Sequence, residues 1–208
     1  MAGTSLWRMG LTLGVLASLF YAATGRAGQP KVLLAVRSDD MFSPDVSITR
    51  ELVVMLDMLK KAGFTPVVAS EDGAPFVSGR TKVETDLKFT KVAISEYVAV
   101  LMPCMTNPAG GTIAPALVKV VNDAAAAGKL IAAQRSAIYI LSVAGLLKGR
   151  KYAYAQPAFP EGIYAGDGVV QDGNIITSAI CPYDAQMKGK SDGTVQLMEM
   201  LIRALKAS

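Results

Sequence analysis

The side chain that enzymes most often use as a general base is missing from this sequence. The 208-residue chain contains no histidine, so no mechanism here can use an imidazole as a general base. Cys104 and Cys181 are the two cysteines and the two sulfur nucleophiles. Zinc and copper sites rely on histidine and clustered cysteine ligands. We therefore expect no metal site and no cofactor.

The segment Gln134-Arg135-Ser136-Ala137 follows the short apolar run Leu130–Ala133. A strand that turns sharply into a helix forms a nucleophile elbow, which directs one side chain into a pocket beside backbone N–H groups. Arg135 occupies the elbow position in this pattern. A guanidinium stays protonated and can act neither as nucleophile nor as base. Ser136 has no histidine to activate it, and we interpret it as a residue that starts the helix.

The elements that must position these residues alternate between strands and helices. Apolar runs of strand length are typical of buried strands, and they occupy residues 32–36, 64–69, 98–102 and 130–133. Helical spacing or helix-boundary residues indicate helices near residues 48–62, 112–127, 137–147 and 192–206. Asp172-Gly173 predicts a hairpin between residues 169–171 and 174–177. This order predicts a three-layer α/β sandwich, a mostly parallel sheet with helices on both faces.

Ligands of such sheets bind at the carboxyl ends of the strands. The residues of interest should therefore follow Val36, Met102 and Ala133. Cys104 and Arg135 satisfy this condition directly, and Cys181 follows the predicted hairpin.

Four segments together resemble the ThiJ/PfpI family of the class I glutamine-amidotransferase-like superfamily. The run GKLIAAQRSAIYILSVAGLLKGRK at 128–151 is similar to the elbow region, and EYVAVLMPCM at 96–105 is similar to the strand that ends in Pro-Gly-Gly. Glu51 lies twelve positions before Gly63, as the acidic residue of the family's first helix does. VVQDGNIITS at 169–178 resembles the C-terminal hairpin. The resemblance implies a flavodoxin-like fold and a homodimer.

The departures from the family pattern affect its chemistry. The family's elbow nucleophile is a cysteine, whereas this chain has Arg135, and the histidine that often follows is Ser136. The Pro-Gly-Gly of the oxyanion site is replaced by Pro103-Cys104-Met105, which adds side chains there. We therefore expect no catalysis at the elbow.

Two interpretations of Arg135 and Glu51 remain open. Glu51 matches the acid that normally contacts the family's cysteine, and a guanidinium fork fits a carboxylate. We expect the two side chains to form an ion pair that fills a disused pocket, or Arg135 to bind the carboxylate or phosphate of a small anionic ligand. Glu51, Cys104, Arg135, Ser136 and Cys181 are the predicted lining of this pocket.

The cysteines leave three alternatives open. Cys104 and Cys181 form a disulfide, Cys104 is a relocated nucleophile activated by Arg135, or both are idle. A relocated nucleophile would make the protein a hydrolase, deglycase or glyoxalase of the family's kind. The favoured hypothesis is a non-catalytic member that binds a ligand or has a structural role.

Residues 1–27 have the pattern of a signal peptide. Arg8 precedes the apolar stretch Leu11–Ala23, and small residues lead to Ala27. The stretch is short for a membrane span, which needs about 20 apolar residues, although retention as an anchor is the alternative. We expect export to the periplasm or outside the cell, with residues 28–208 as the mature domain. The formal net charge of +4 then falls by two, and no basic stripe predicts nucleic-acid binding.

Overall fold

The computed structural model describes residues 28–37, 43–104 and 113–207. The predicted signal peptide, Met105 and the loop before residue 113 lie outside the described residues. The main sheet has seven strands in the order β10-β11-β7-β6-β1-β2-β5. Their bounds are β1 Lys31–Ala35, β2 Thr65–Ser70, β5 Leu87–Lys88, β6 Tyr97–Met102, β7 Leu130–Gln134, β10 Val169–Asp172 and β11 Ile175–Ser178. All neighbours pair in parallel except β10 and β11, the predicted hairpin.

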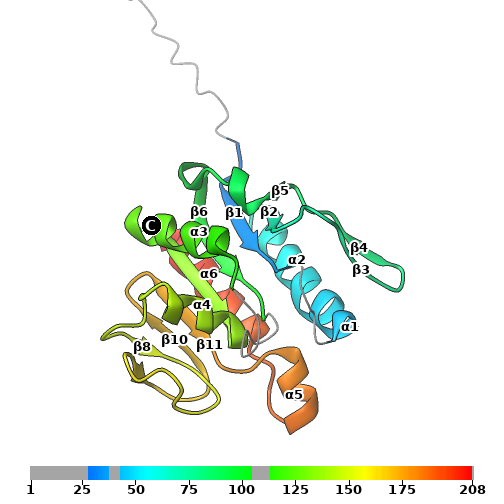
Figure 1. Ribbon diagram of the computed structural model, residues 1–208. Coiled ribbons are helices and arrows are strands. Elements are labelled where there is room, and N and C mark those ends of the chain that lie inside the picture. The colour runs from blue at the N-terminus through cyan, green and yellow to red at the C-terminus, as the bar shows by residue number, and fades with distance from the viewer. Residues whose placement is uncertain (1–27, 38–42, 105–112, 208) are drawn as a thin grey trace, which may run out of the picture.

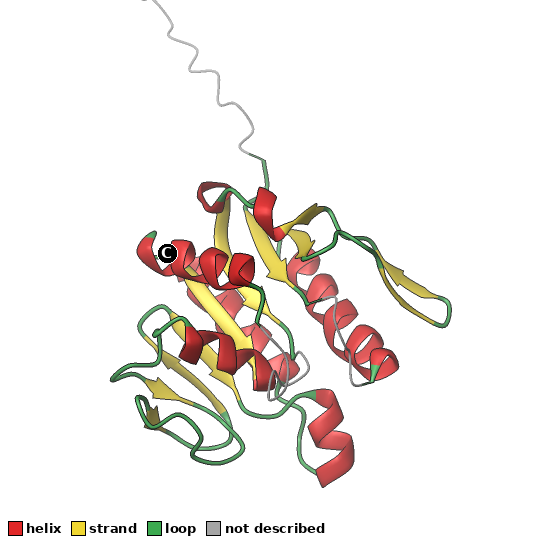
Figure 2. Cartoon of the chain, in the orientation of Figure 1, coloured by secondary structure: helices red, strands yellow, loops and turns green. Residues whose placement is uncertain are grey.

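Helices cover both faces of this sheet (Figures 1 and 2). Their bounds are α1 Pro44–Val46, the π-helical segment η1 Ser47–Leu52, α2 Val53–Lys61, α3 Pro115–Ala126, α4 Ile138–Val143, α5 Pro182–Lys188 and α6 Thr194–Ala207. The 3₁₀ turns are η2 Phe89–Lys91, η3 Ile94–Glu96 and η4 Arg135–Ala137. This architecture is the predicted three-layer α/β sandwich.

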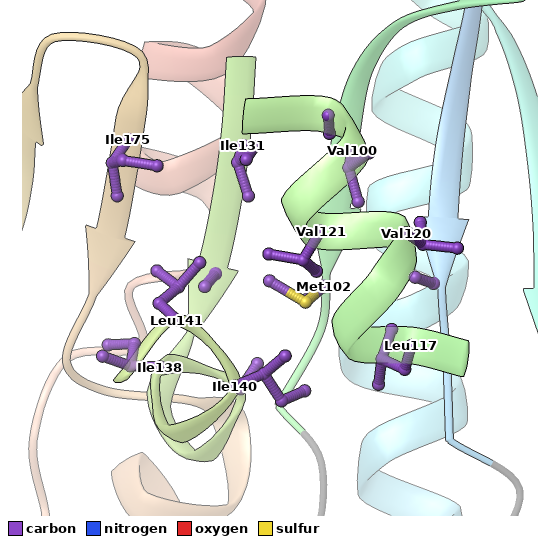
Figure 3. Close-up of a cluster of buried hydrophobic side chains, with 14 of the residues drawn as sticks. Val100, Met102, Leu117, Val120, Val121, Ile131, Ile138, Ile140, Leu141 and Ile175 are labelled. Carbon is purple, nitrogen blue, oxygen red and sulfur yellow. The ribbon is translucent and has the colours of Figure 1, made fainter. Parts of the chain in front are cut away.

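Alternation along β1 divides the core into two halves. Leu33 and Ala35 face a cluster that includes α3 and α4, whereas Val32 and Leu34 face α2 and α6. Figure 3 shows the first half, where side chains of α3 and α4 pack over β6, β7 and β11. The core therefore holds the central strands rigidly on both sides.

Two glycines set where helices end. Gly63 has φ +92° and follows α2, with its N–H donating to Lys60 O at 3.1 Å. Gly145 has φ +72° and ends α4 at Val143, four residues before the expected end at 147. Both positions need the left-handed backbone that glycine adopts without a Cβ penalty.

Two small sheets lie outside the main one and were not predicted. β3 (Phe76–Ser78) and β4 (Thr81–Val83) form a hairpin that projects beside β2 and β5 (Figure 1). β8 (Lys151–Tyr152) pairs in parallel with β9 (Ile163–Tyr164). Helix α5 was also not predicted, and it lies at the candidate site.

Candidate functional site

The elbow forms where it was predicted, at the end of β7. Arg135 has φ +49° and is the only residue other than glycine with positive φ in the described ranges. This left-handed conformation costs an L-residue roughly 1–2 kcal/mol. Gln134 precedes it and is fully buried, and its Nε2 donates to Ile180 O at 3.0 Å and to Thr194 Oγ1 at 2.9 Å. These bonds fix the end of β7 to the segment after β11 and to the start of α6.

The side chain of Arg135 pairs with Asp184 on α5. Its Nε donates to Asp184 Oδ2, and Lys188 Nζ lies 2.7 Å from Asp184 Oδ1. Burial opposes ionisation of Asp184, but the hydrogen bonds from Lys188 and Arg135 outweigh it and lower the pKa of the carboxyl below its usual value. The guanidinium carbon also lies 4.3 Å from the centroid of the Tyr154 ring, in cation–π range.

The predicted ion pair between Arg135 and Glu51 is therefore wrong. Glu51 lies in η1 with only 1% of its surface exposed, and its Oε1 accepts a 2.6 Å hydrogen bond from the backbone N–H of Cys104. Burial and the nearby charge of Cys181 raise the pKa of Glu51 well above its usual value. Burial therefore favours the neutral form of this carboxyl, and Arg135 takes its counter-charge from Asp184 on α5.

The two cysteines are brought together at the same place. They are not joined by a disulfide, and the thiol of Cys104 hydrogen-bonds to Cys181. This bond and burial raise the pKa of Cys104, whereas the same bond lowers the pKa of Cys181. The two thiols therefore titrate as a pair rather than separately. Cys181 is buried at 2% exposure, and Cys104 is half-buried.

Backbone N–H groups are directed at both sulfur atoms. The N–H of Ser136 donates to Cys104, and the N–H groups of Tyr183 and Asp184 donate to Cys181. Ser136 thus contributes its backbone within η4, as the interpretation of a helix-start residue requires. In an elbow enzyme, the backbone N–H of the residue after the nucleophile helps to stabilise an oxyanion. Here that N–H belongs to Ser136, and it donates to the sulfur of Cys104.

One donor at the elbow lacks an acceptor within the described residues. Nη1 of Arg135 is buried and makes no hydrogen bond there. The side chain as a whole keeps 18% of its surface exposed. A buried guanidinium N–H without an acceptor destabilises the fold. An anionic ligand that accepted a hydrogen bond from Nη1 would remove this cost.

Sequence reasoning missed two residues of the site, Asp184 and Tyr154. Asp184 could have been found, because Cys181-Pro182 begins a helix at a proline, Lys188 lies four residues after Asp184, and Gly189 ends the helix with φ +62°. Tyr154 follows a two-residue strand, and no periodicity identifies it.

Among the residues that the structure describes, no three histidine, cysteine or acidic side chains cluster as metal ligands. Within the same ranges, no helix has the length and hydrophobicity needed to span a membrane. Neither finding bears on residues 1–27.

Comparison with known proteins places this geometry in a family. No curated protein sequence matches the chain. The ThiJ/PfpI domain protein of Brachyspira murdochii superposes with a TM-score of 0.67 at 15% identity, over 87% of this chain and 99% of that one. Toxoplasma gondii DJ-1, in an oxidised form, gives 0.59 at 27% identity, over 86% and 96%.

A longer protein shares the same domain. An Anabaena variabilis protein with DJ-1/ThiJ/PfpI-like and ferritin-like domains matches with a TM-score of 0.62 at 23% identity, over 82% of this chain and 54% of its own length. The sequence model of the DJ-1/PfpI family matches residues 41–189, a range that contains the elbow, both cysteines, Glu51 and Asp184. The chain belongs to the DJ-1/PfpI family.

Proposed function

We propose that this protein is an exported, non-catalytic member of its family that binds a small anionic ligand at the elbow through Arg135. The observation that carries the proposal is Nη1 of Arg135, a buried cationic donor without an acceptor among the described residues. Asp184 engages Nε of the same guanidinium, and Tyr154 also hydrogen-bonds to it, so Nη1 is the donor left for a carboxylate or phosphate oxygen.

The charge around the elbow also favours an anion. Arg135 and Lys188 are two cations that share one carboxylate, Asp184. Burial raises the pKa of Glu51 and so disfavours a negative charge on its carboxyl. Counted by themselves, Arg135, Asp184 and Lys188 carry one net positive charge, which a bound monoanion would neutralise.

Anion titration tests the ligand proposal. Acetate, glycolate, phosphate and sulfate are titrated at constant ionic strength, with thermal shift and calorimetry as readouts. We expect saturable stabilisation by at least one of them and its loss in Arg135→Gln. Arg80→Gln is the matched control, because Arg80 lies exposed in the turn between β3 and β4. Equal binding by Arg135→Gln, or no saturable binding by any of the four anions, would refute the proposal.

The absence of catalysis rests on the elbow itself. Arg135 cannot attack a carbonyl, and the N–H of Ser136 is taken by Cys104. We expect no glyoxalase, deglycase or peptidase turnover above background, and none after Arg135→Cys. A relocated nucleophile at Cys104 is the alternative, but its raised pKa opposes thiolate formation. Turnover of a small dicarbonyl or a peptide that disappears in Cys104→Ser would establish that alternative.

Export and the homodimer are proposed on other grounds. Export rests on the charged, apolar and small-residue order of residues 1–27. The homodimer rests on the family resemblance, and size-exclusion chromatography with light scattering tests it.

A further inference from the structure

The two cysteines come from strands that are not neighbours. Cys104 follows β6 by two residues, and Cys181 follows β11 by three. Both strands pair with β7, where Met102 is level with Ala133 and Ser178 with Gln134. Two strand spacings separate β6 from β11, about 9–10 Å. The thiols nevertheless hydrogen-bond, so both connections turn inward over the end of β7.

Each cysteine is held in this position by bonds of its own. The backbone N–H of Cys104 donates to the buried carboxyl of Glu51 at 2.6 Å. The carbonyl of Cys181 accepts from Ala185 N at 2.9 Å in the first turn of α5, and the preceding carbonyl, Ile180 O, accepts from Gln134. The hydrogen-bonded pair is therefore already assembled between the ends of the two strands.

We propose that Cys104 and Cys181 are a reversible thiol–disulfide pair, which closes to an intramolecular disulfide by exchange with a small-molecule disulfide. The test of this inference does not require an anion to bind at Arg135. The sequence left three alternatives for these two residues: a disulfide, a relocated nucleophile at Cys104, or no role. The proposal selects a disulfide that forms reversibly.

Exposure decides which sulfur reacts first. The residue Cys104 is half-buried, whereas Cys181 is 2% exposed, so Cys104 offers the wider approach to an incoming disulfide, although burial also raises the pKa of its thiol. The hydrogen bond between the thiols lets the pair share one proton after it has lost the other, and transfer of the shared proton to Cys181 places the thiolate on Cys104. Arg135 and the N–H of Ser136 lie beside Cys104 and stabilise that charge.

The exchange is a two-electron reaction that balances with one small disulfide. The Cys104 thiolate attacks one sulfur of the disulfide, whose S–S bond breaks, and the first thiolate leaves and takes up the proton from Cys181. The Cys181 thiolate then attacks Cys104 in the mixed disulfide and displaces the second thiolate, which takes a proton from water. The protein dithiol is oxidised to a disulfide, and the small disulfide is reduced to two thiols.

Glutathione redox buffers test the proposal on the full purified protein. Samples equilibrated at different ratios of reduced to oxidised glutathione are acid-quenched and alkylated, and their intact masses are measured. We expect the wild type to lose both alkylatable thiols together, without retaining glutathione, and to recover both in excess reduced glutathione.

Two serine variants separate the roles of the sulfurs. Cys181→Ser should hold one glutathione on Cys104, because the second thiol is missing. Cys104→Ser should react at least about tenfold more slowly, because the remaining sulfur is buried. Circular dichroism checks that both variants fold, and the wild-type titration decides the question if one does not. The proposal is overturned if the wild type keeps two free thiols in excess oxidised glutathione, accumulates the mixed disulfide, or forms a disulfide between two chains.

Discussion

Replacement of Asp184 by asparagine is the most direct test of how the elbow is held. Asp184 accepts from Arg135 and Lys188 and is the only carboxylate paired with Arg135 in the described residues. The variant keeps the size of the side chain and one oxygen acceptor, but it removes the negative charge. The guanidinium then stays partly buried against Tyr154 without a counter-ion.

The size of the effect follows from burial. Loss of one partner of a fully buried pair costs about 3–5 kcal/mol, and loss of an exposed pair costs about 0–1 kcal/mol. The side chains of Arg135 and Asp184 are 18% and 10% exposed, whereas Lys188 is 45% exposed. We expect Asp184→Asn to lower the free energy of unfolding at pH 7 by about 2 kcal/mol, between these limits.

The pH dependence provides a second check on the same pair. The folded protein lowers the pKa of Asp184 below its usual value of 3.8. A lowered carboxyl pKa stabilises the folded state above the unfolded pKa, and this stability is lost as the pH falls through the folded pKa. The difference between wild type and Asp184→Asn should thus be constant near neutral pH and shrink below about pH 4.

Urea unfolding followed by circular dichroism at pH 7 and at acid pH measures both quantities. Asp57→Asn is the matched control, because Asp57 pairs with Lys61 on the exposed surface of α2. Side-chain exposures of 55% and 75% predict a loss below about 0.5 kcal/mol. Equal losses in the two variants would refute the conclusion that the pair with Asp184 holds Arg135 at the elbow.

Three further predictions concern the rest of the chain. Glu51→Gln should cost less than about 1 kcal/mol and Glu51→Ala about 1–3 kcal/mol, because only the latter leaves a backbone N–H without an acceptor. The raised pKa of Glu51 stabilises the fold below the unfolded pKa, so wild type should lose stability relative to Glu51→Gln as the pH rises above about 4.5. Gly193→Ala should cost about 1–3 kcal/mol in urea unfolding, because its Cβ would lie 2.4 Å from Ser178 Oγ, whereas Gly168→Ala, with nothing within 4 Å, should be near neutral. Mass spectrometry of the exported protein should find an N-terminus at residues 23–29, and an intact N-terminus recovered from membranes would contradict cleavage.

The sheet could be predicted because its central strands are continuous apolar runs. β1, β6 and β7 lie within one or two residues of the predicted ranges, and the hairpin of β10 and β11 forms as expected. Such strands are buried on both faces, so their composition alone identifies them. The two-residue strands β8 and β9 are too short to carry a periodic signal.

The partner of Arg135 could not be predicted by the same reasoning. The elbow lies between two candidate carboxylates, Glu51 on η1 and Asp184 on α5, the latter 49 residues away in sequence. Which of the two helices lies next to the elbow depends on the order of the strands in the sheet, and sequence spacing does not give that order. Because β11 lies beside β7, the helix that follows β11 reaches the guanidinium, and Glu51 is left to bind the backbone of Cys104.

The elbow keeps the backbone of a nucleophile elbow and uses its groups differently. The positive φ of Arg135 is retained, and its cost is offset by the ion pair with Asp184 and the stacking on Tyr154. The N–H of Ser136 serves Cys104, which in turn hydrogen-bonds to Cys181. Closure of the Cys104–Cys181 disulfide would replace that thiol hydrogen bond with a covalent bond and remove the two ionisable thiols from the neighbourhood of Arg135. If Arg135 binds an anion as we propose, oxidation of the cysteine pair should strengthen that binding, because the disulfide cannot carry a competing negative charge.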